Sequence, residues 1–245
     1  MTRPGAWLTT VASRICLDLL GSARVRRERY VGEWIPEPVP GDPEWFGGPA
    51  PADPADRITL DESISMAFLV VLDSMTPAER VAFVLHDVFR YSFAEVAEVV
   101  GRTPAACRQL ASSARRRIDT SERPSSTERA EVVRDFKRAW ETSDIEALIG
   151  LLDPQAIATA DGGGLALAFR DPINGGEQIA RVWMEIAARR SMPTLLERTV
   201  NGQPGLVAQL DGTIVSVYAF DISDGRITRI WAIRNPEKLR PWTTG

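Results

Sequence analysis

The chain has 245 residues, of which 44% are hydrophobic and 25% are charged, and its formal net charge is −4. This composition describes a globular protein with room for two domains. No apolar run approaches the roughly 18 residues that a membrane-spanning helix needs, and the first residues lack the pattern of a secretory signal. Cys16 and Cys107 are too few for a disulfide framework. We therefore expect a cytoplasmic protein without a membrane partner. The lack of Cys/His spacings suited to a ligand set predicts no metal site, and we expect no cofactor.

Charge is distributed unevenly along the chain. Residues 1–30 carry a net charge of +4, residues 31–98 one of −10, residues 99–118 one of +5 and residues 119–245 one of −3. The third block contains five arginines and no acidic residue. Two basic blocks separated by an acidic one indicate a polyanionic partner that is contacted at two places.

The first two segments differ sharply in character. Residues 1–30 are predicted to form an amphipathic helix with an arginine-rich end, because apolar residues recur at helical spacing from Trp7 to Leu20. Residues 31–60 contain seven prolines and four glycines. Since proline lacks the amide hydrogen that helices and sheets use, we expect an extended acidic linker there.

Residues 61–118 show helical periodicity with clear start and stop signals. Two capping boxes mark helix N-termini. Gly101 suits the left-handed position that ends a helix, and Thr103 followed by Pro104 begins the next one. A short helix, a tight turn and a second helix predict a helix-turn-helix domain. The capping boxes pair Thr76 with Glu79 and Ser92 with Glu95.

The second helix of this pair has an apolar stripe and a polar outer face. Cys107, Leu110, Ala114 and Ile118 share the stripe, which can pack on the preceding helix. Arginine clamps phosphates or pairs with guanine, glutamine pairs with adenine, and serine reaches either. Arginines near a helix end also complement the helix dipole, but the caps, the turn glycine and the acid-free outer face favour contact with DNA. The residues predicted on this face are Arg108, Gln109, Ser112, Arg115 and Arg116.

Residues 119–127 are predicted to form a polar linker, and residues 128–245 to form a second domain. It begins with two helices that place Val133, Phe136 and Trp140 on one face. A further helix is expected in GGEQIARVWMEIAARR, and Asx-Gly turns separate several strands. Helices followed by a curled antiparallel sheet predict an α+β cone. The expected strands are AIATADGGG, LALAFRD, TLLERTV, LVAQL, TIVSVYAFDI and RITRIWAI.

The stretch LDSMTPAERVAFVLHDVFRYSFAEVAEVVGRTPAACRQLASSARRRI strongly resembles region 4 of the extracytoplasmic-function (ECF) RNA polymerase sigma factors, and the opening helix resembles the end of sigma region 2. WIPEP, DGGG and NPEKL resemble motifs of the group that carries a C-terminal SnoaL-like domain. Ile35 stands where leucine is more usual, and Leu165 where a basic residue is common. The resemblance implies a multidomain protein, in which an all-α helix-turn-helix domain precedes a cone of the nuclear transport factor 2 type.

The resemblance also implies a function. It implies recognition of the promoter −35 element by region 4, with Arg102 and Thr103 added to the reading face, and binding to the β flap and β′ subunit of core RNA polymerase. The earlier part of region 2, which in the family grips polymerase and melts the −10 element, is absent from this sequence. We therefore expect a shortened chain that does not initiate transcription alone.

The C-terminal domain is expected to regulate this activity in cis. The three glycines of DGGG permit close backbone approaches. Trp34 in the linker is expected to dock on this domain, with Glu37 held by a nearby donor, and Asn235-Pro236 to end the last strand. The residues expected at this interdomain site are Trp34, Pro36, Glu37, Asp161, Gly162, Gly163, Gly164, Asn235, Pro236, Lys238 and Leu239.

A second interpretation stays open, in which an isomerase-like, cyclase-like or ligand-sensing cone is fused to a DNA-binding module. Proton abstraction needs a carboxylate with a raised pKa and a hydrogen-bond donor, and the candidates are Asp161, Asp171 and Asp221 with Tyr218. Aspartate beside glycine more often forms a turn than acts as a base, so we expect no catalytic residue and no enzyme. A small ligand inside the cone is left open. The single histidine, His86, lies among apolar residues and is predicted to be structural.

Overall fold

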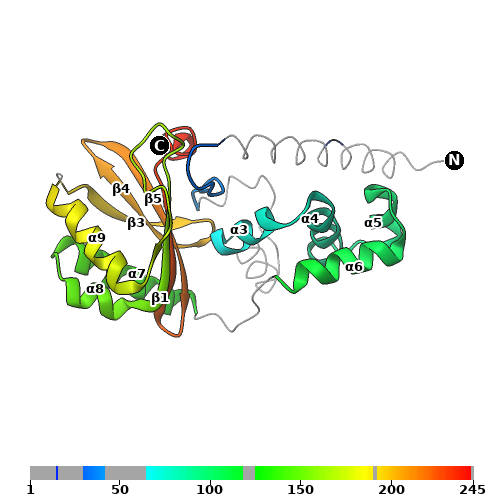
Figure 1. Ribbon diagram of the computed structural model, residues 1–245, viewed down its shortest axis with the longest axis horizontal. Helices are drawn as coiled ribbons and strands as arrows, with labels where there is room; N and C mark the ends of the chain where they lie inside the picture. The colour runs from blue at the N-terminus through cyan, green and yellow to red at the C-terminus, as the bar shows by residue number, and fades with distance from the viewer. Residues whose placement is uncertain (1–14, 16–29, 42–64, 118–124, 190–191, 244–245) are drawn as a thin grey trace. The chain divides into compact units, whose positions relative to one another are not determined.

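The computed structural model describes residues 15, 30–41, 65–117, 125–189 and 192–243 (Figure 1). Apart from Ile15 and Tyr30, the predicted N-terminal helix lies outside the described residues, as do residues 42–60 of the acidic linker and 119–124 of the polar linker.

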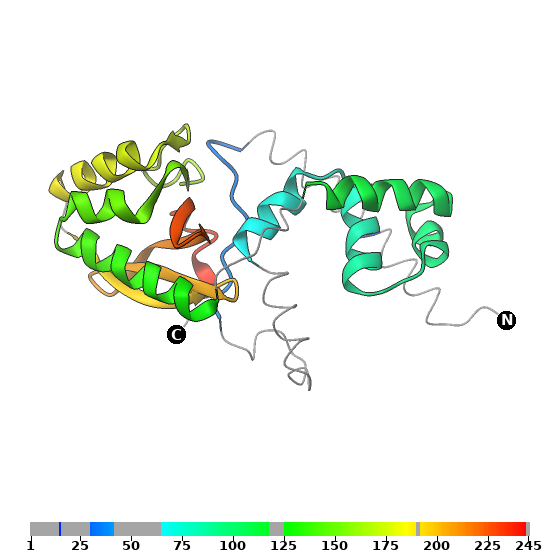
Figure 2. The ribbon, with the colours of Figure 1, turned by 90° about the horizontal axis from the view of Figure 1, so that it is seen from below.

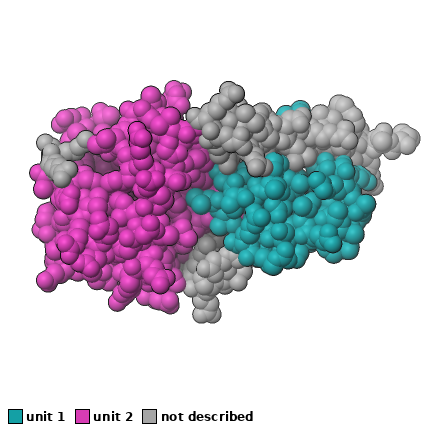
Figure 3. All heavy atoms as spheres, in the orientation of Figure 1, with its two compact units in different colours: residues 1–29, 70–120 teal, residues 30–69, 121–245 magenta. Residues whose placement is uncertain are grey.

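The chain divides into two compact units (Figure 3). We call residues 1–29 and 70–120 the helical unit, and residues 30–69 and 121–245 the sheet unit. Residues 31–41, predicted as linker, therefore group with the sheet unit, as does Tyr30, which was predicted as the end of the N-terminal helix. Within the described ranges, no helix combines the length and the apolar character that a membrane crossing requires.

The predicted helical segment begins with α3 (Met66–Ser74) and α4 (Pro77–Phe83) and continues through a π-helix, η2 (Val84–Val88), to α5 (Phe93–Val100) and α6 (Pro104–Arg115). In Figures 1 and 2, α4, α5 and α6 pack against one another. Their shared core is small and consists of buried side chains from three helices. These are Ala82, Val96, Ala97 and Cys107.

The predicted capping signals are confirmed. The side chains of Thr76 and Ser92 accept hydrogen bonds from the backbone of the third residue of each helix, whose glutamate side chain bonds back to the cap. Gly101 ends α5 in the left-handed region, at φ 69°, and Thr103 caps α6. These local contacts fix where α5 ends and α6 begins, and so confirm the helix-turn-helix.

From Ser125 onward, the described residues of the sheet unit form six strands and three α-helices. The strands run β1 (Leu152–Asp161), β2 (Ile173–Asn174), β3 (Thr194–Val200), β4 (Gln203–Leu210), β5 (Thr213–Ser223) and β6 (Arg226–Ile233). The helices are α7 (Ser126–Glu141), α8 (Ile145–Leu151) and α9 (Gly176–Arg189), and a short 3₁₀ turn, η3 (Arg240–Trp242), follows the sheet. All three α-helices lie on one face of the curved sheet (Figures 1 and 2).

The sheet is mixed, so the expectation of an antiparallel sheet is wrong for one of its pairings. Its order is β2-β1-β6-β5-β4-β3, and β1 and β6 pair in parallel while every other pairing is antiparallel. The reason is the connection through α9. After this connection, β3 runs antiparallel to β1. The hairpins β3–β4, β4–β5 and β5–β6 each reverse the chain direction, so β6 runs parallel to β1 and pairs with it.

The predicted strand LALAFRD is also wrong. The chain turns at this point, because the amides of Leu165 and Ala166 both donate to the carbonyl of Gly162. Leu165 and Leu167 are 66% and 68% exposed, so the alternating apolar pattern does not mark a buried face here. The short strand β2 pairs with β1 instead.

Aromatic rings fill the space between the helices and the sheet. Phe136 and Trp140 from α7 meet Phe220 and Tyr218 from β5, with ring centroids 5.4 Å and 5.3 Å apart in the two pairs. Trp183 from α9 joins them at 6.1 Å from Trp140. The face predicted for α7 is therefore confirmed as part of the core.

Candidate DNA interface and linker-docking site

The outer face of α6 is polar and open to solvent. Its inner face is formed by Cys107, Ala111 and Ala114, each 0% exposed, so the buried stripe also contains Ala111, which the sequence analysis did not assign to it. Leu110 is half-buried, and Ile118 lies outside the described residues. Of the predicted reading residues, Ser112 is half-buried, and the others are exposed. The exposed ones are Arg102, Thr103, Arg108, Gln109, Arg115 and Arg116.

Contacts within the helical unit orient several of these side chains. The Arg108 guanidinium lies 5.3 Å from the centre of the Phe93 ring, and Arg116 donates to the Ser112 hydroxyl at 3.2 Å. Arg115 donates through Nε to Asp87 of η2 at 2.7 Å. The local sequence suggests an outer face without acidic neighbours. The fold nevertheless brings Asp87 to this face from 28 residues away.

The side chains of His86 and Phe93 connect this face to the start of α5. His86 is structural, as predicted, since its Nδ1 lies 2.7 Å from the Tyr91 carbonyl oxygen and its ring stacks on Phe93 at 3.8 Å. Phe93 thus contacts both His86 and Arg108. This arrangement ties the start of α5 to the outer face of α6.

Glu79 joins the start of α4 to the end of α6. Its carboxylate accepts from the backbone and hydroxyl of Thr76 at 2.9 and 2.8 Å and from the Ser113 hydroxyl at 2.8 Å. The Arg117 guanidinium lies 3.7 Å away. These contacts, led by the backbone hydrogen bond from Thr76, hold the pKa of Glu79 below its ordinary value.

A second site gathers around Asp161 in the sheet unit. This carboxylate, 1% exposed, lies at the end of β1. It accepts hydrogen bonds from the Tyr30 hydroxyl at 2.5 Å, the Ile35 amide at 3.2 Å, the Gly163 amide at 3.0 Å and the Lys238 ammonium at 2.7 Å. Two of these donors come from residues 30–41, so Asp161 fixes the start of the linker to the sheet unit.

Lys238 completes the charge pair. Its side chain is 4% exposed, and besides Asp161 its ammonium donates to the Ile35 carbonyl. The ammonium also lies over two linker rings, 3.4 Å from the centre of Trp34 and 5.1 Å from that of Tyr30. A buried charge is tolerated only when it is paired and hydrogen-bonded, and here the linker supplies part of both requirements.

Asn235 closes the same cluster from the other side. Its amide nitrogen Nδ2 donates to the Tyr30 hydroxyl at 2.6 Å, and its backbone amide donates to the Asp161 carbonyl at 2.9 Å. Burial and the hydrogen bond to Asp161 raise the pKa of Tyr30 well above its ordinary value. Gly163 is required here, because it adopts φ 61° and a Cβ atom would lie 2.4 Å from Asn235 Nδ2.

The remaining predicted interdomain residues differ in burial. Leu239 and Gly162 are buried, whereas Pro36 and Gly163 are half-buried. Glu37 is exposed. The described hydrogen-bond donors at this site bond to the Asp161 carboxylate rather than to Glu37. Gly164 and Pro236 are also exposed.

The linker continues along the edge strand β3. Val39 and Asn201 exchange two hydrogen bonds of 2.8 Å, and Gly41 donates to the Thr199 carbonyl at 3.0 Å. The Trp242 indole donates to the Pro38 carbonyl at 2.9 Å. Sequence reasoning missed Tyr30, Asn201 and Trp242 as linker contacts. Asn201 carried a signal, Asn-Gly, but that pattern also marks an ordinary turn.

The four candidate groups for catalysis do not come together. Asp161 is occupied by its four donors, and Asp171 is exposed. Asp221 is half-buried on β5, and Tyr218 lies in the aromatic core, where burial raises its pKa. Among the described residues, no group of three or more His, Cys, Asp or Glu side chains is placed to hold a metal ion.

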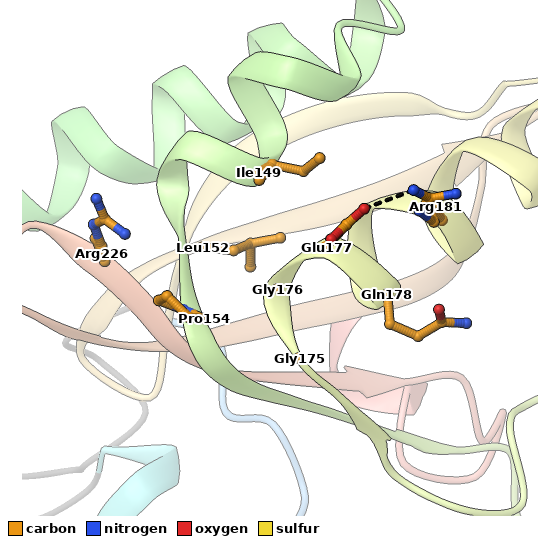
Figure 4. A pocket seen from close by; sticks show the side chains of 9 residues that line it. All are labelled: Ile149, Leu152, Pro154, Gly175, Gly176, Glu177, Gln178, Arg181 and Arg226. Carbon is orange, nitrogen blue, oxygen red and sulfur yellow. Dashed lines mark hydrogen bonds and ion pairs between the residues drawn. The ribbon is translucent and has the colours of Figure 1, made fainter.

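A cavity of about 650 Å³ lies elsewhere in the sheet unit, beside the start of α9 (Figure 4). Glu177 and Arg181, an ion pair of 2.6 Å, face it together with Arg226. None of the four catalytic candidates lines it. The sheet unit thus offers a docking site for the linker but no assembled catalytic centre among its described residues.

The described parts of this protein are a helix-turn-helix module and an α+β cone that binds the linker residues 30–41. Comparisons with known proteins identify the class of protein that has this combination. Residues 65–118 match the family model described as sigma-70, region 4. The chain is 36% identical over 242 residues to the probable ECF RNA polymerase sigma factor SigI of Mycobacterium tuberculosis, covering 96% of this chain and 78% of that protein. It is 37% identical over 251 residues to the ECF sigma factor SigJ of the same organism, with the same two coverages.

The crystal structure of Mycobacterium tuberculosis SigJ matches with a TM-score of 0.74 and 33% sequence identity, over 98% of this chain and 84% of that chain. The chain belongs to the ECF RNA polymerase sigma factors, in the group with a SnoaL-like C-terminal domain. It is a transcription initiation factor, and membership of this family implies promoter DNA and core RNA polymerase as its partners. The alternative of an enzyme fused to a DNA-binding module is not favoured.

Proposed function

We propose that this sigma factor recognises the promoter −35 element through the exposed face of α6. The observation that carries the proposal is the division of α6 into a fully buried small-residue face and an exposed face with Arg108 and Gln109 at its centre. A helix of this kind fits the major groove, where arginine and glutamine discriminate between bases. Arg102, Thr103, Ser112 and Arg116 flank these two residues and complete the reading surface.

Arg115 has a more specific part in this proposal. Its Nε is held by Asp87, so the side chain is oriented before DNA arrives. Orientation by a fixed partner reduces the conformational freedom that binding would otherwise remove. The helical unit would further contact the β flap of core RNA polymerase, while other parts of the factor contact β′.

The sheet unit acts in this proposal as a regulator in cis. It holds residues 30–41 through the Asp161–Lys238 pair, Asn235 and Asn201, and so controls how far the acidic linker extends from a fixed point. We assign it no catalysis, because its best-placed carboxylate is engaged by four donors. On this basis the functional linker would begin after Gly41.

The DNA-reading proposal is tested by selection from a library of random duplexes with the full chain. Wild type should enrich a short motif, and Arg108→Ala and Arg115→Ala should each lower the preference for that motif about 5- to 150-fold, the range expected for one lost base contact. Arg138→Ala is the matched control, because Arg138 is an exposed arginine of α7 that pairs with Asp135. A wild-type chain that enriches no motif, or an enrichment untouched by both substitutions, would contradict the proposal.

A further inference from the structure

Arg90 has a backbone conformation that side chains of its size rarely adopt. Its φ is 61°, in the left-handed region. Outside glycine, the described residues with positive φ are Arg90, Ser143, Asn201, Asp211 and Asp224. Asparagine and aspartate tolerate this region because their short side chains bond locally, and arginine has no such compensation. Arg90 is therefore a strained position in the helical unit.

The fold at this point does not require an arginine. The turn ends η2 through hydrogen bonds from Phe89 to Val84 and from Tyr91 to Leu85, both made by the backbone. Glycine fills the equivalent position at the end of α5, where Gly101 has φ 69°. Glycine at position 90 would adopt the same turn without strain.

The Arg90 side chain is exposed, and within the described part of the chain no hydrogen bond or ion pair is recorded for its guanidinium. The charge therefore contributes nothing visible to folding. A strained residue whose side chain makes no such contact within the described residues points to a role in function.

The position of Arg90 suggests that role. Phe93 lies three residues further along the chain, so its Cα is within about 11 Å of that of Arg90. The Phe93 ring lies 5.3 Å from the guanidinium of Arg108, at the centre of the proposed reading surface. An arginine side chain extended from position 90 can therefore reach the border of that surface, which is where the sugar-phosphate backbone of a duplex read by α6 would run.

We propose that Arg90 binds a DNA phosphate beside the bases that α6 reads, and that the strained turn is retained because it places this charge. The inference rests on the proposed function of α6. It adds a contact that carries affinity but no sequence information, since phosphates are the same in every duplex.

Three substitutions in the full chain separate charge from strain. Arg90→Lys keeps both, Arg90→Ala loses the charge but keeps the strained turn, and Arg90→Gly loses both. The probe is a labelled duplex of random sequence, titrated at several salt concentrations. Arg90→Ala and Arg90→Gly should weaken binding about three- to tenfold and lower the slope of log K against log salt by about 0.9, while Arg90→Lys retains the slope.

Thermal unfolding supplies the second measurement. Arg90→Gly should raise the melting temperature of the helical unit by about 2–5 °C, because relief of strain outweighs the added flexibility of glycine, whereas Arg90→Ala should not raise it. Ser143→Gly is the matched control for strain, since Ser143 is exposed and has φ 56° in the sheet unit. It should leave DNA binding unchanged.

The outcomes distinguish this inference from the proposal on which it rests. If wild type fails to bind the duplex at low salt, both the proposed function and the inference on Arg90 are refuted. If wild type binds and Arg90→Ala keeps the wild-type salt slope, only the role of Arg90 is refuted. A fall in binding of the same size for Arg90→Lys would also refute it, because a phosphate contact tolerates either cation.

Discussion

Asp161 and Lys238 depend on each other because both charges are almost fully buried. Their side chains are 0% and 4% exposed, and water cannot replace a lost partner. Removing one partner of such a pair leaves the other charge unpaired, which typically costs about 3–5 kcal/mol, whereas removing both can be close to neutral. The linker contributes to this balance through Tyr30, Ile35 and Trp34.

We predict that Asp161→Asn and Lys238→Met each lower the free energy of unfolding of the sheet unit by about 3 kcal/mol, and that the double variant loses much less than the sum. Denaturant titration of the full chain measures this. Asp171→Asn, at an exposed aspartate, is the control and should change stability by less than about 0.5 kcal/mol. Strictly additive losses would show that the two charges do not stabilise each other.

The same substitutions should release the linker. Because residues 30–41 are held by contacts with Asp161 and Lys238, Asp161→Asn is expected to increase the rate of proteolytic cleavage within this segment several-fold. Limited proteolysis followed by mass spectrometry locates the cut. An unchanged cleavage rate with a destabilised sheet unit would mean that Asn201 and Trp242 suffice to hold the linker.

At the level of elements, local signals were predicted well from the sequence. Capping boxes, a left-handed glycine and a proline in the first helical turn all act within a few residues, so the helix-turn-helix and its boundaries were accessible. The parallel pairing of β1 with β6 could not be predicted from the sequence, because it depends on how the connection through α9 reverses the chain. The segment 165–171 was misread since its alternating pattern matches a strand while a turn at Gly162 directs it away.

Glu79 makes the packing of α4 on α6 dependent on pH. Because contacts in the folded state lower its pKa from the ordinary 4.5, the folded state holds this proton less tightly than the unfolded state does. Its contribution to stability is therefore complete above about pH 4.5 and is lost as the pH falls through the lower folded-state pKa.

We predict that Glu79→Gln destabilises the helical unit by about 1 kcal/mol at pH 7 and reduces the loss of stability between pH 5 and pH 3, because the titrating group is gone. Thermal unfolding followed by circular dichroism at both pH values measures the effect. Glu98→Gln, at an exposed glutamate of α5, is the control and should keep the wild-type pH dependence. Equal acid sensitivity in wild type and Glu79→Gln would contradict this assignment.

At the scale of the whole molecule, the sequence identified the parts but not all of their contacts. WIPEP, DGGG and NPEKL lie far apart in the chain, and the sheet brings Trp34, Asp161 and Lys238 into one cluster. Tyr30 and Asn201 belong to the same docking site but carry no local pattern that separates them from ordinary core or turn residues. Asp87 was missed for the same reason, since only the packing of η2 near α6 brings it to Arg115.

Direct reading of bases by α6 is the central feature of the proposed function, and a change of specificity tests it more sharply than a loss of binding. Glutamine pairs with adenine and arginine with guanine in the major groove. Duplex selection with Gln109→Arg in the full chain should therefore replace the preferred base pair at one position of the wild-type motif with one that presents guanine, and leave the other positions as they are. A motif identical to that of wild type, or one altered at every position, would contradict direct reading by α6.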